Sequence, residues 1–308
     1  MLTFILHKIM KPSFILTSLL FGTAASSSAG QVIQEVQTRG SAEISHEFEA
    51  SYNASAGARS NVSPVRDANI SEQNTHVQYV FGYALPGKPV FRLGVGYDRY
   101  DFGFAGPGFI PGALQSVNLV AGIDLRLSDF LIRIEAQPGF YGDDRGFNAG
   151  DFNVPVILGA SYLVSKDFQW IAGLYYNPNA SNPVMGGIGF RWKMADRWTL
   201  NFVPPNPRIE FKATDDLTLY AGGQILSSTF RVNKNFGGTP TRNYSNALVD
   251  YTEVRAGAGA SWKLSPKGAL DMELGYMAYR DFDYHKVRDN FQSRSGALYG
   301  QVGLRLNF

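Results

Sequence analysis

One short stretch of the sequence, residues 280–289, carries side chains suited to acid and base chemistry. It reads RDFDYHKVRD and places Asp281, Asp283 and His285 at alternate positions. Alternate side chains of a β-strand lie on one face, so these three groups would lie together beside the loop that follows. A carboxylate there could orient the imidazole as a general base. A solvated strand end or a calcium site has the same pattern, and no second acidic pair is evident opposite it.

Other apparent motifs do not support catalysis or nucleotide binding. GYALPGK, residues 82–88, has the spacing of a phosphate-binding loop, but Pro89 replaces the Ser or Thr that would hold magnesium. No two of the four histidines have the spacing of zinc ligands. The chain has no cysteine, which excludes disulfides, thiolate metal sites and cysteine nucleophiles. We therefore expect no enzyme activity, no catalytic residue, no metal and no cofactor.

The first 29 residues are predicted to be a secretory signal peptide. His7, Lys8 and Lys11 precede an apolar run from residue 14 to 21, and small residues follow, with cleavage after Ala25 or Ala29. The run is shorter than the roughly 20 residues that a transmembrane helix needs. Without this segment the 28 basic residues fall to 26, equal to the 26 acidic ones. A neutral chain argues against a nucleic-acid partner.

The rest of the chain, 30–308, alternates between apolar and polar residues over one segment after another. QSVNLVAGIDLRL, residues 115–127, places Val117, Leu119 and Ile123 on one face and Asp124 and Arg126 on the other. The same alternation recurs at 130–137, 184–194, 208–213, 253–264 and 297–308. None of these windows has the three-to-four-residue period of a helix. The chain is predicted to be all-β.

Short and long connections alternate between these segments. Short turn signals lie at 86–88, 128–129, 165–167, 195–197, 214–216 and 265–268, and longer connections include 54–73, 141–150, 232–250 and 283–295. This asymmetry is typical of a transmembrane antiparallel up-and-down β-barrel, with short periplasmic turns and longer external loops. The segments number about fourteen. The count falls to twelve if NFVPPNPRIEF, residues 201–211, folds outside the membrane, because proline interrupts a strand ladder.

Charged residues opposite the apolar face would line the lumen of such a barrel. The candidate lumen-lining residues are Arg92, Asp124, Arg126, Arg133, Glu135, Arg191, Lys193, Arg208, Glu210, Lys212, Arg255 and Arg305. Basic residues slightly outnumber acidic ones among the predicted inward positions, which indicates at most a weak anion preference. The alternative is that these charges form ion pairs that stiffen the wall.

The last residues carry the most specific signal of location. Val302, Leu304, Leu306 and the terminal Phe308 alternate with Gly303, Arg305 and Asn307. This ending is similar to the C-terminal assembly signature of Gram-negative outer-membrane β-barrel proteins, and the chain resembles that family, in a porin-like but uncharacterised form. The resemblance implies integral insertion in the outer membrane after export through the periplasm, with outer-membrane lipid and the barrel-assembly machinery as partners. A soluble β-sandwich or lipocalin-like barrel would also alternate.

Three functions remain open at this level. A barrel of about fourteen strands approaches the sixteen-stranded porins that leave a channel, which favours a passive channel for small hydrophilic solutes. The segment at 31–41 is too short to fill the lumen. The alternatives are an outer-membrane hydrolase at the extracellular rim around Asp283 and His285, as in proteases of the omptin type, and a structural or adhesive barrel without transport.

Overall fold

The computed structural model describes residues 43–60, 68–85, 89–104, 110–239 and 241–308. The predicted signal peptide and the segment 31–41 lie outside the described residues. The strands are β1 (Glu43–Ser60), β2 (Ala68–Ala84), β3 (Val90–Gly103), β4 (Ala113–Leu127), β5 (Phe130–Ala136), β6 (Gly139–Asp143), β7 (Phe152–Asn153), β8 (Val156–Ser165), β9 (Phe168–Tyr176), β10 (Val184–Ala195), β11 (Trp198–Phe202), β12 (Arg208–Lys212), β13 (Leu217–Arg231), β14 (Gly238–Thr239), β15 (Arg242–Asn243), β16 (Leu248–Ser265), β17 (Gly268–Tyr284), β18 (Asp289–Gln292) and β19 (Ala297–Asn307). One short 3-10 helix occupies Ala149–Asp151. None of the helical segments in these ranges is long and apolar enough to cross a membrane.

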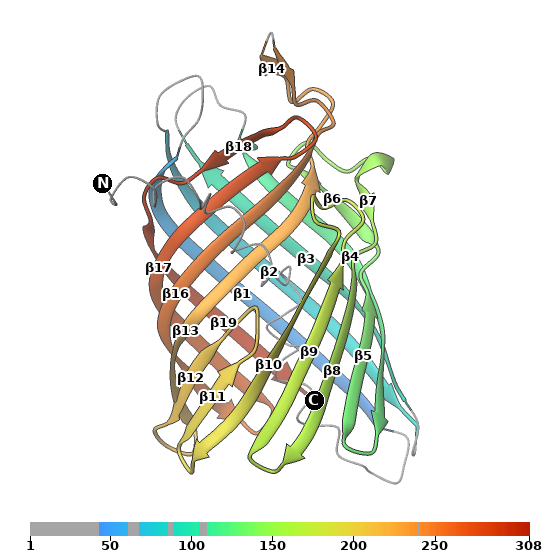
Figure 1. The fold of residues 1–308 in the computed structure, drawn as a ribbon, viewed down its shortest axis with the longest axis vertical. Coiled ribbons are helices and arrows are strands. Elements are labelled where there is room, and N and C mark those ends of the chain that lie inside the picture. Colours follow the sequence, from blue (N-terminus) through green and yellow to red (C-terminus); the bar gives the residue numbers. More distant parts are fainter. Residues whose placement is uncertain (1–42, 61–67, 86–88, 105–109, 240) are drawn as a thin grey trace, which may run out of the picture.

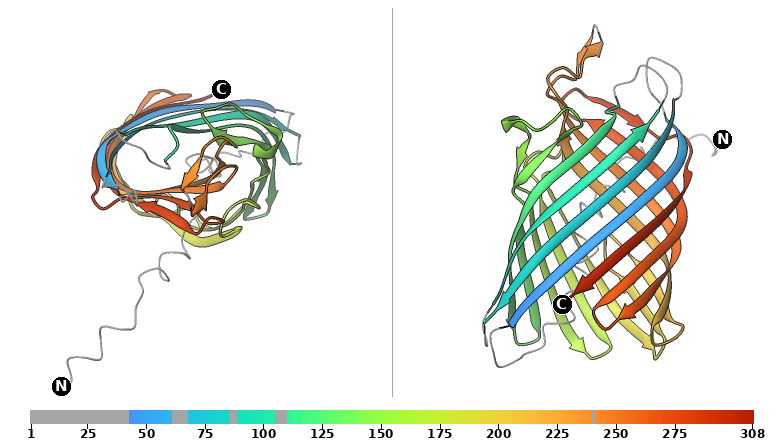
Figure 2. Two further views of the ribbon diagram at one scale, coloured as in Figure 1. Left: turned by 90° about the horizontal axis from the view of Figure 1, so that it is seen from above. Right: turned by 180° about the vertical axis from the view of Figure 1, so that it is seen from behind.

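The strands form a closed antiparallel barrel with 14 strands in its wall, which confirms the predicted fold (Figure 1). β1 pairs with β2 on one side and with β19 on the other, so the seam has no free edge. Two of the wall strands are interrupted. One consists of β5 followed by β6, and the other consists of β18 followed by β19. Figure 2 shows the tilted strands around the lumen and the C terminus at the end with the short turns. In membrane barrels that end is periplasmic.

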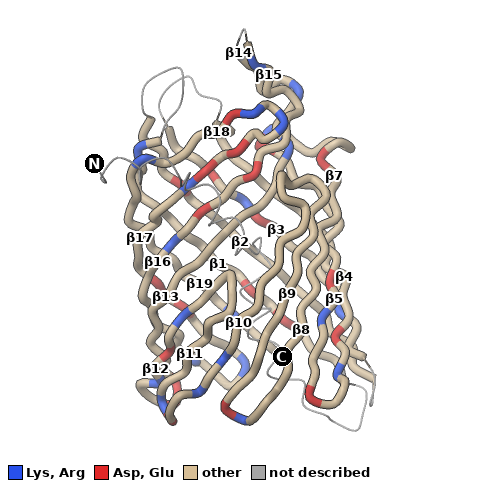
Figure 3. The backbone as a smooth tube through the Cα atoms, viewed as in Figure 1, with Lys and Arg blue, Asp and Glu red and all other residues tan. Residues whose placement is uncertain are grey.

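The barrel exposes apolar side chains on its outer face and directs charged ones inward. Ile188, Leu298 and Leu274 are 70%, 71% and 75% exposed, whereas Arg92 and Arg133 are 4% exposed. Charged residues occur along the strands and at both ends of the barrel (Figure 3). An outward apolar band around a polar interior is the surface that a hydrocarbon solvent requires. This chain is therefore a membrane β-barrel of the outer-membrane type.

The predicted assembly residues lie on this outer face at the seam. Val302 is 43% exposed, and Leu304 and Leu306 follow it at alternate positions opposite Ala50 and Phe48 of β1. The amide of Phe308 donates to the carbonyl of His46 at 2.9 Å, and the two rings stack with centroids 5.2 Å apart. The last residue thus extends the pairing that closes the barrel. Its role as an assembly signal stays a prediction.

A β-bulge in β17 reverses which residues face the lumen. Arg255 of β16 lies opposite Met277 and Val254 lies opposite Tyr279, so Ala278 is the extra residue. Below the bulge the outward residues are apolar, and above it Phe282 and Tyr284 point inward while Asp281 points outward. An extra residue shifts the two-residue alternation by one. The extracellular end of the barrel therefore has an apolar interior and a polar surface.

The extracellular end is also narrower than the rest of the barrel. At Arg231, β13 pairs in parallel with Gly142 of β6, although β6 is far from β13 in the order of the wall. The amide of Asn233 donates to Asp143 Oδ2 at 2.7 Å beside this contact. Inward side chains of this part form a buried cluster, the extracellular core, made of Ile70, Tyr100, Phe102, Ile110, Leu114, Tyr141, Phe230, Val232, Tyr244, Ala247, Val249, Tyr251, Phe282, Tyr284 and Phe291.

Several predicted connections were wrong because they belong to this narrower end. Instead of a loop at 54–73, β1 runs to Ser60 and β2 begins at Ala68. The first residues of the predicted loop at 141–150 belong to β6. The hairpin β14–β15 and the start of β16 occupy part of the predicted loop at 232–250, and β18 lies within the one at 283–295. The outward residues of these strand ends meet water, so their polarity resembled that of loops. The proline turn between β11 and β12 was predicted correctly and lies in the wall, which gives fourteen strands.

Candidate functional site

Four buried charges lie directly beneath the extracellular core. Arg280 contacts Glu72 and Glu253, each at 2.6 Å, and Arg255 contacts Glu72 at 3.1 Å and Glu253 at 2.7 Å. All four side chains are at most 2% exposed. The hydroxyl of Tyr251, a member of the core, donates to Glu72 at 2.5 Å. Because each carboxylate has cationic partners, the charges can remain in the interior, where unpaired charges would be costly.

Nine of the twelve predicted lumen residues are buried or half-buried, Arg126, Lys193 and Lys212 are exposed, and most of the twelve are ion-paired. Arg92 contacts Glu47, Asp124 and Glu135, and Arg133 holds Asp124 through two bonds of 2.7 Å. Further ion pairs are Arg191–Glu210, Arg208–Glu210, Arg305–Asp271 and Arg255–Glu253, with Lys193–Asp196 and Lys212–Asp215 at the periplasmic turns. Arg126 is exposed near the same end. These ion pairs therefore mainly stiffen the barrel wall.

The predicted rim cluster lies on the outer surface of the barrel, above the apolar band. Asp283 lies opposite Asp250 of β16, and His285 Nδ1 is 3.5 Å from Asp250 Oδ2. Burial, followed by repulsion from Asp283, raises the pKa of Asp281 to about 7. Burial, followed by repulsion from Asp250, raises the pKa of Asp283. The structure thus brings the predicted residues together and adds Asp250. No group of three potential metal ligands occurs in the part of the chain that the structure describes.

The barrel wall is interrupted between β10 and β13. β10 pairs with β11 only from Phe190 onward, and the ladder between β12 and β13 ends at Gly222. The carbonyls of Pro207 and Pro205 extend that ladder to the amides of Gly223 and Ile225. Beyond them, residues 184–189 of β10 pair only with β9, and residues 226–230 of β13 pair only with β16. We call this region, above the proline turn, the wall interruption.

The loop between β9 and β10 closes the upper side of the wall interruption. The amide of Ser181 in this loop donates to Asp250 Oδ2 at 2.8 Å. Thr229 of β13 donates its hydroxyl to the other oxygen of Asp250 at 2.6 Å. Asp250 therefore connects the loop to both β13 and β16. The wall interruption is bounded by this loop above and by the turn at 203–207 below.

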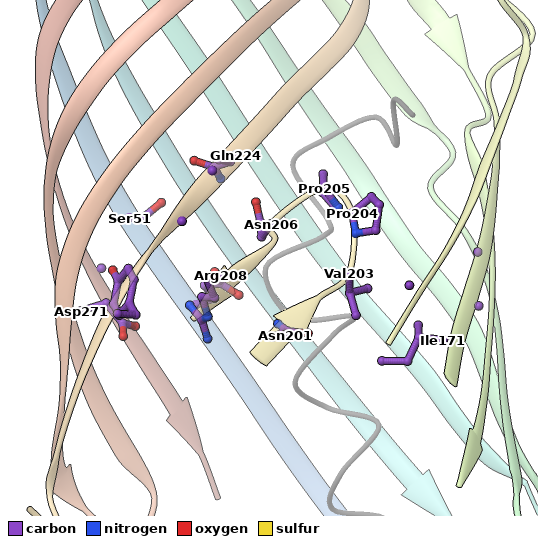
Figure 4. Close-up of a pocket in the computed structure, with 18 of the residues that line it drawn as sticks. Ser51, Ile171, Asn201, Val203, Pro204, Pro205, Asn206, Arg208, Gln224 and Asp271 are labelled. Carbon is purple, nitrogen blue, oxygen red and sulfur yellow. The ribbon is translucent and has the colours of Figure 1, made fainter. Parts of the chain in front are cut away.

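A cavity of about 180 Å³ lies inside the barrel beside the wall interruption. Gly187 and Gly189 of β10, Pro204 and Pro205 of the turn, and Gln224 of β13 all line it (Figure 4). Its opposite side is charged and is formed by Glu49, Asp271, Glu273 and Arg305, and Arg208 of β12 lies beside β11. The cavity thus has an apolar side toward the wall interruption and a polar side toward β1, β17 and β19.

Sequence reasoning missed the extracellular core, the buried charges and the wall interruption. Glu72 and Ile70 fell in a predicted loop, and the inward position of Arg280 depends on the bulge at Ala278, which the sequence analysis did not predict. The one available signal for the wall interruption was the proline turn, because two short strands between two long neighbours cannot cover the full height of the wall. The paired inward prolines at 204–205 mark where that cover ends.

Solved structures to which this chain is similar include several outer-membrane proteins. The COG4313 outer membrane channel from Pseudomonas putida F1 has 10% identity and a TM-score of 0.47, with 86% of this chain and 96% of that chain covered. The toluene transporter TodX of Pseudomonas putida has 9% identity and a TM-score of 0.45, with 95% of this chain and 96% of that chain covered. The translocator domain of the autotransporter NalP from Neisseria meningitidis has 15% identity and a TM-score of 0.38, with 91% of this chain and 93% of that chain covered.

Comparison of the sequence with protein families gives one match. The model described as "Domain of unknown function (DUF6268)" matches residues 132–307, which is more than half of the chain. The matched region begins in β5 and includes the wall interruption, the rim cluster and the C-terminal strand. No curated protein matches the sequence.

Proposed function

This chain belongs to the DUF6268 family, and we propose that it is an outer-membrane transport barrel whose substrates pass sideways between the bilayer and the lumen. The route begins at the wall interruption, enters the cavity and continues toward the periplasmic end. Its substrates are small molecules with a large apolar part, because they must be soluble in the lipid that surrounds the wall.

One observation carries this proposal: the cavity adjoins the place where the wall lacks strand pairing, whereas the axis above it is occupied. The extracellular core and the four buried charges lie between the cavity and the exterior. Residues of β10, the proline turn and β13 line both the cavity and the wall interruption. A molecule that leaves lipid at this height meets the cavity without crossing the core.

The passive channel for small hydrophilic solutes remains the alternative. It requires a continuous aqueous path along the axis, and the filled extracellular end gives no support to such a path in this conformation. The rim hydrolase is favoured by the geometry of Asp250, Asp283 and His285, but Asp250 already accepts two hydrogen bonds that hold the loop and β13. We assign this cluster a structural role. The proposal therefore involves transport without catalysis.

The location proposed for the protein follows from its two ends. Export through the periplasm rests on the predicted signal peptide at 1–29, and insertion by the barrel-assembly machinery rests on the terminal residues around Phe308. The outward apolar band supplies the contact with outer-membrane lipid.

Uptake of an apolar dye by bacteria that express the protein tests the proposed function. N-phenyl-1-naphthylamine fluoresces when it reaches phospholipid, and the intact outer membrane slows it. Expression should raise the uptake rate, and Gln224→Trp should return it toward background, because the larger side chain occupies the cavity beside the wall interruption. Leu274→Trp, on the lipid-facing surface, is the matched control and should not change uptake. Equal uptake by the wild type and Gln224→Trp would contradict the proposal.

A further inference from the structure

We propose that the cavity selects uncharged molecules that carry a hydroxyl group on an apolar body, and that Asn201 is the residue that recognises the hydroxyl. This inference rests on the proposed function and names its substrate class. It follows from three properties of the cavity: an unpartnered buried amide, apolar side chains in the same cavity, and arginines that are already paired with carboxylates.

The amide of Asn201 is buried and lacks a partner among the described residues. Asn201 belongs to β11, lines the cavity and is 6% exposed, and its Oδ1 atom accepts no hydrogen bond there. Asn206, on the turn that follows, also lines the cavity and has an unpartnered Oδ1. A buried polar atom without a partner is destabilising, so a ligand that supplies a donor to Oδ1 removes that penalty on binding.

A hydroxyl group matches this amide better than other polar groups. The carboxamide offers one acceptor, Oδ1, and a donor, Nδ2, and a hydroxyl both donates and accepts. A ligand hydroxyl can therefore donate to Oδ1 of Asn201. A hydrocarbon would leave Oδ1 of Asn201 buried and unpaired. This unpaired acceptor lowers the affinity for the hydrocarbon relative to the alcohol.

Apolar side chains line the cavity near Asn201, whereas Arg191 of β10 and Arg208 of β12 lie opposite it in the two strand ladders. Val203, Pro204 and Pro205 of the turn and Ile171 of β9 line the cavity around it (Figure 4). Ile171 is 7% exposed, and none of these four side chains has a hydrogen-bonding group. The body of the ligand would thus contact apolar side chains while its hydroxyl lies at the base of the turn.

The charges that line the other side of the cavity oppose a charged ligand. Arg305 holds Asp271 through bonds of 2.7 and 2.8 Å, and Arg208 holds Glu210 at 2.7 Å. Glu49 lies opposite Arg305 in the pairing of β1 with β19. Each arginine that could bind an anion is already engaged by a carboxylate. A carboxylate ligand would have to displace one of these partners, so the cavity favours a neutral molecule over an anion.

Three probes of equal chain length separate these possibilities: octane, 1-octanol and octanoate. Each would displace the fluorescent reporter 1-aminoanthracene from the refolded full chain in lipid nanodiscs. Partitioning into the bilayer is the same for every variant, so differences between variants report the site. The wild type should bind 1-octanol in preference to octane and octanoate. Asn201→Leu should reduce the preference for 1-octanol over octane about three- to tenfold, the loss expected for one hydrogen bond.

Thr199→Val is the matched control, because Thr199 lies two residues earlier on the same face of β11 and does not line the cavity. It should retain the wild-type preference. The heat-dependent mobility of the folded barrel on gels shows whether each variant assembles, and Asn201→Ala replaces Asn201→Leu if the larger residue prevents assembly. An unchanged preference in the Asn201 variant overturns this inference. Binding of octane and 1-octanol without preference in the wild type also overturns it but leaves the proposed function intact. Failure of all three probes to displace the reporter overturns both.

Discussion

Arg231 of β13 pairs in parallel with Gly142 of β6, although six other strand segments lie between β6 and β13 in the order of the wall. This contact turns the upper part of a wide barrel into a narrow one that its own side chains can fill. Arg231 Nε also donates to the carbonyl of Gly150 at 2.7 Å, which fixes the loop that follows β6. The closure of the extracellular end is thus a property of the backbone as well as of the core.

The extracellular core should contribute strongly to stability. Phe230 is 1% exposed and packs against Tyr100 and Tyr141, with ring centroids 6.0 and 6.4 Å apart. Phe230→Ala should lower the free energy of unfolding by about 3–5 kcal/mol, because it leaves a cavity in a packed cluster. Urea unfolding in lipid vesicles measures this. Leu219→Ala, at a 43% exposed lipid-facing position of the same strand, is the control and should cost clearly less.

Removing one of the four buried charges should destabilise the folded barrel more than removing one arginine and one glutamate together. Arg280→Met leaves Glu72 and Glu253 with only one arginine, and removal of one member of a buried pair costs about 3–5 kcal/mol. Adding Glu72→Gln should restore part of that loss, because the number of buried charges then balances again. The same unfolding measurement tests both variants. A double variant as unstable as the sum of its two single changes would exclude this coupling.

Stability should decrease as the pH rises toward neutrality because of Asp281. Burial raises the pKa of Asp281 to about 7, so between about 4 and 7 the folded barrel holds a proton that the unfolded chain has released. The folded state binds more protons in that range, and raising the pH therefore disfavours it. Asp281→Asn should flatten this dependence, and its unfolding midpoint should exceed that of the wild type most clearly at pH 8. Midpoints measured from pH 5 to 8 that fall equally in both proteins would show that another group is responsible.

The loop between β9 and β10 should limit access to the wall interruption. Asp250 accepts hydrogen bonds from the Ser181 amide and the Thr229 hydroxyl, so Asp250→Ala releases the loop from β13 and β16. We expect severalfold faster uptake of N-phenyl-1-naphthylamine with little change in the amount of folded barrel. His285→Ala, which removes the neighbouring side chain and keeps both hydrogen bonds, is the control. Uptake that is slower in Asp250→Ala than in the wild type would argue that the loop guides substrates.

The sequence predicted the parts of this barrel that depend on a uniform two-residue alternation. Lipid on one side and polar side chains on the other impose that pattern on β4, β12 and β19, so their faces could be assigned correctly. It could not predict β17 as a whole, because one extra residue, Ala278, changes the alternation without any mark in composition. It also could not predict that Arg231 meets Gly142, since that contact depends on the three-dimensional path of β13. The inward position of Asn201 was readable from β11, but its lack of a partner was not.

The central claim is that the route through this barrel leaves the axis below the extracellular core. Single-channel current across a planar bilayer, recorded with the refolded mature protein, tests it most directly. We expect no steady ion-conducting steps from the wild type, because the core and the four buried charges occupy the axis. Stable steps whose size rises in proportion to salt concentration would contradict it and would establish an aqueous channel for hydrophilic solutes.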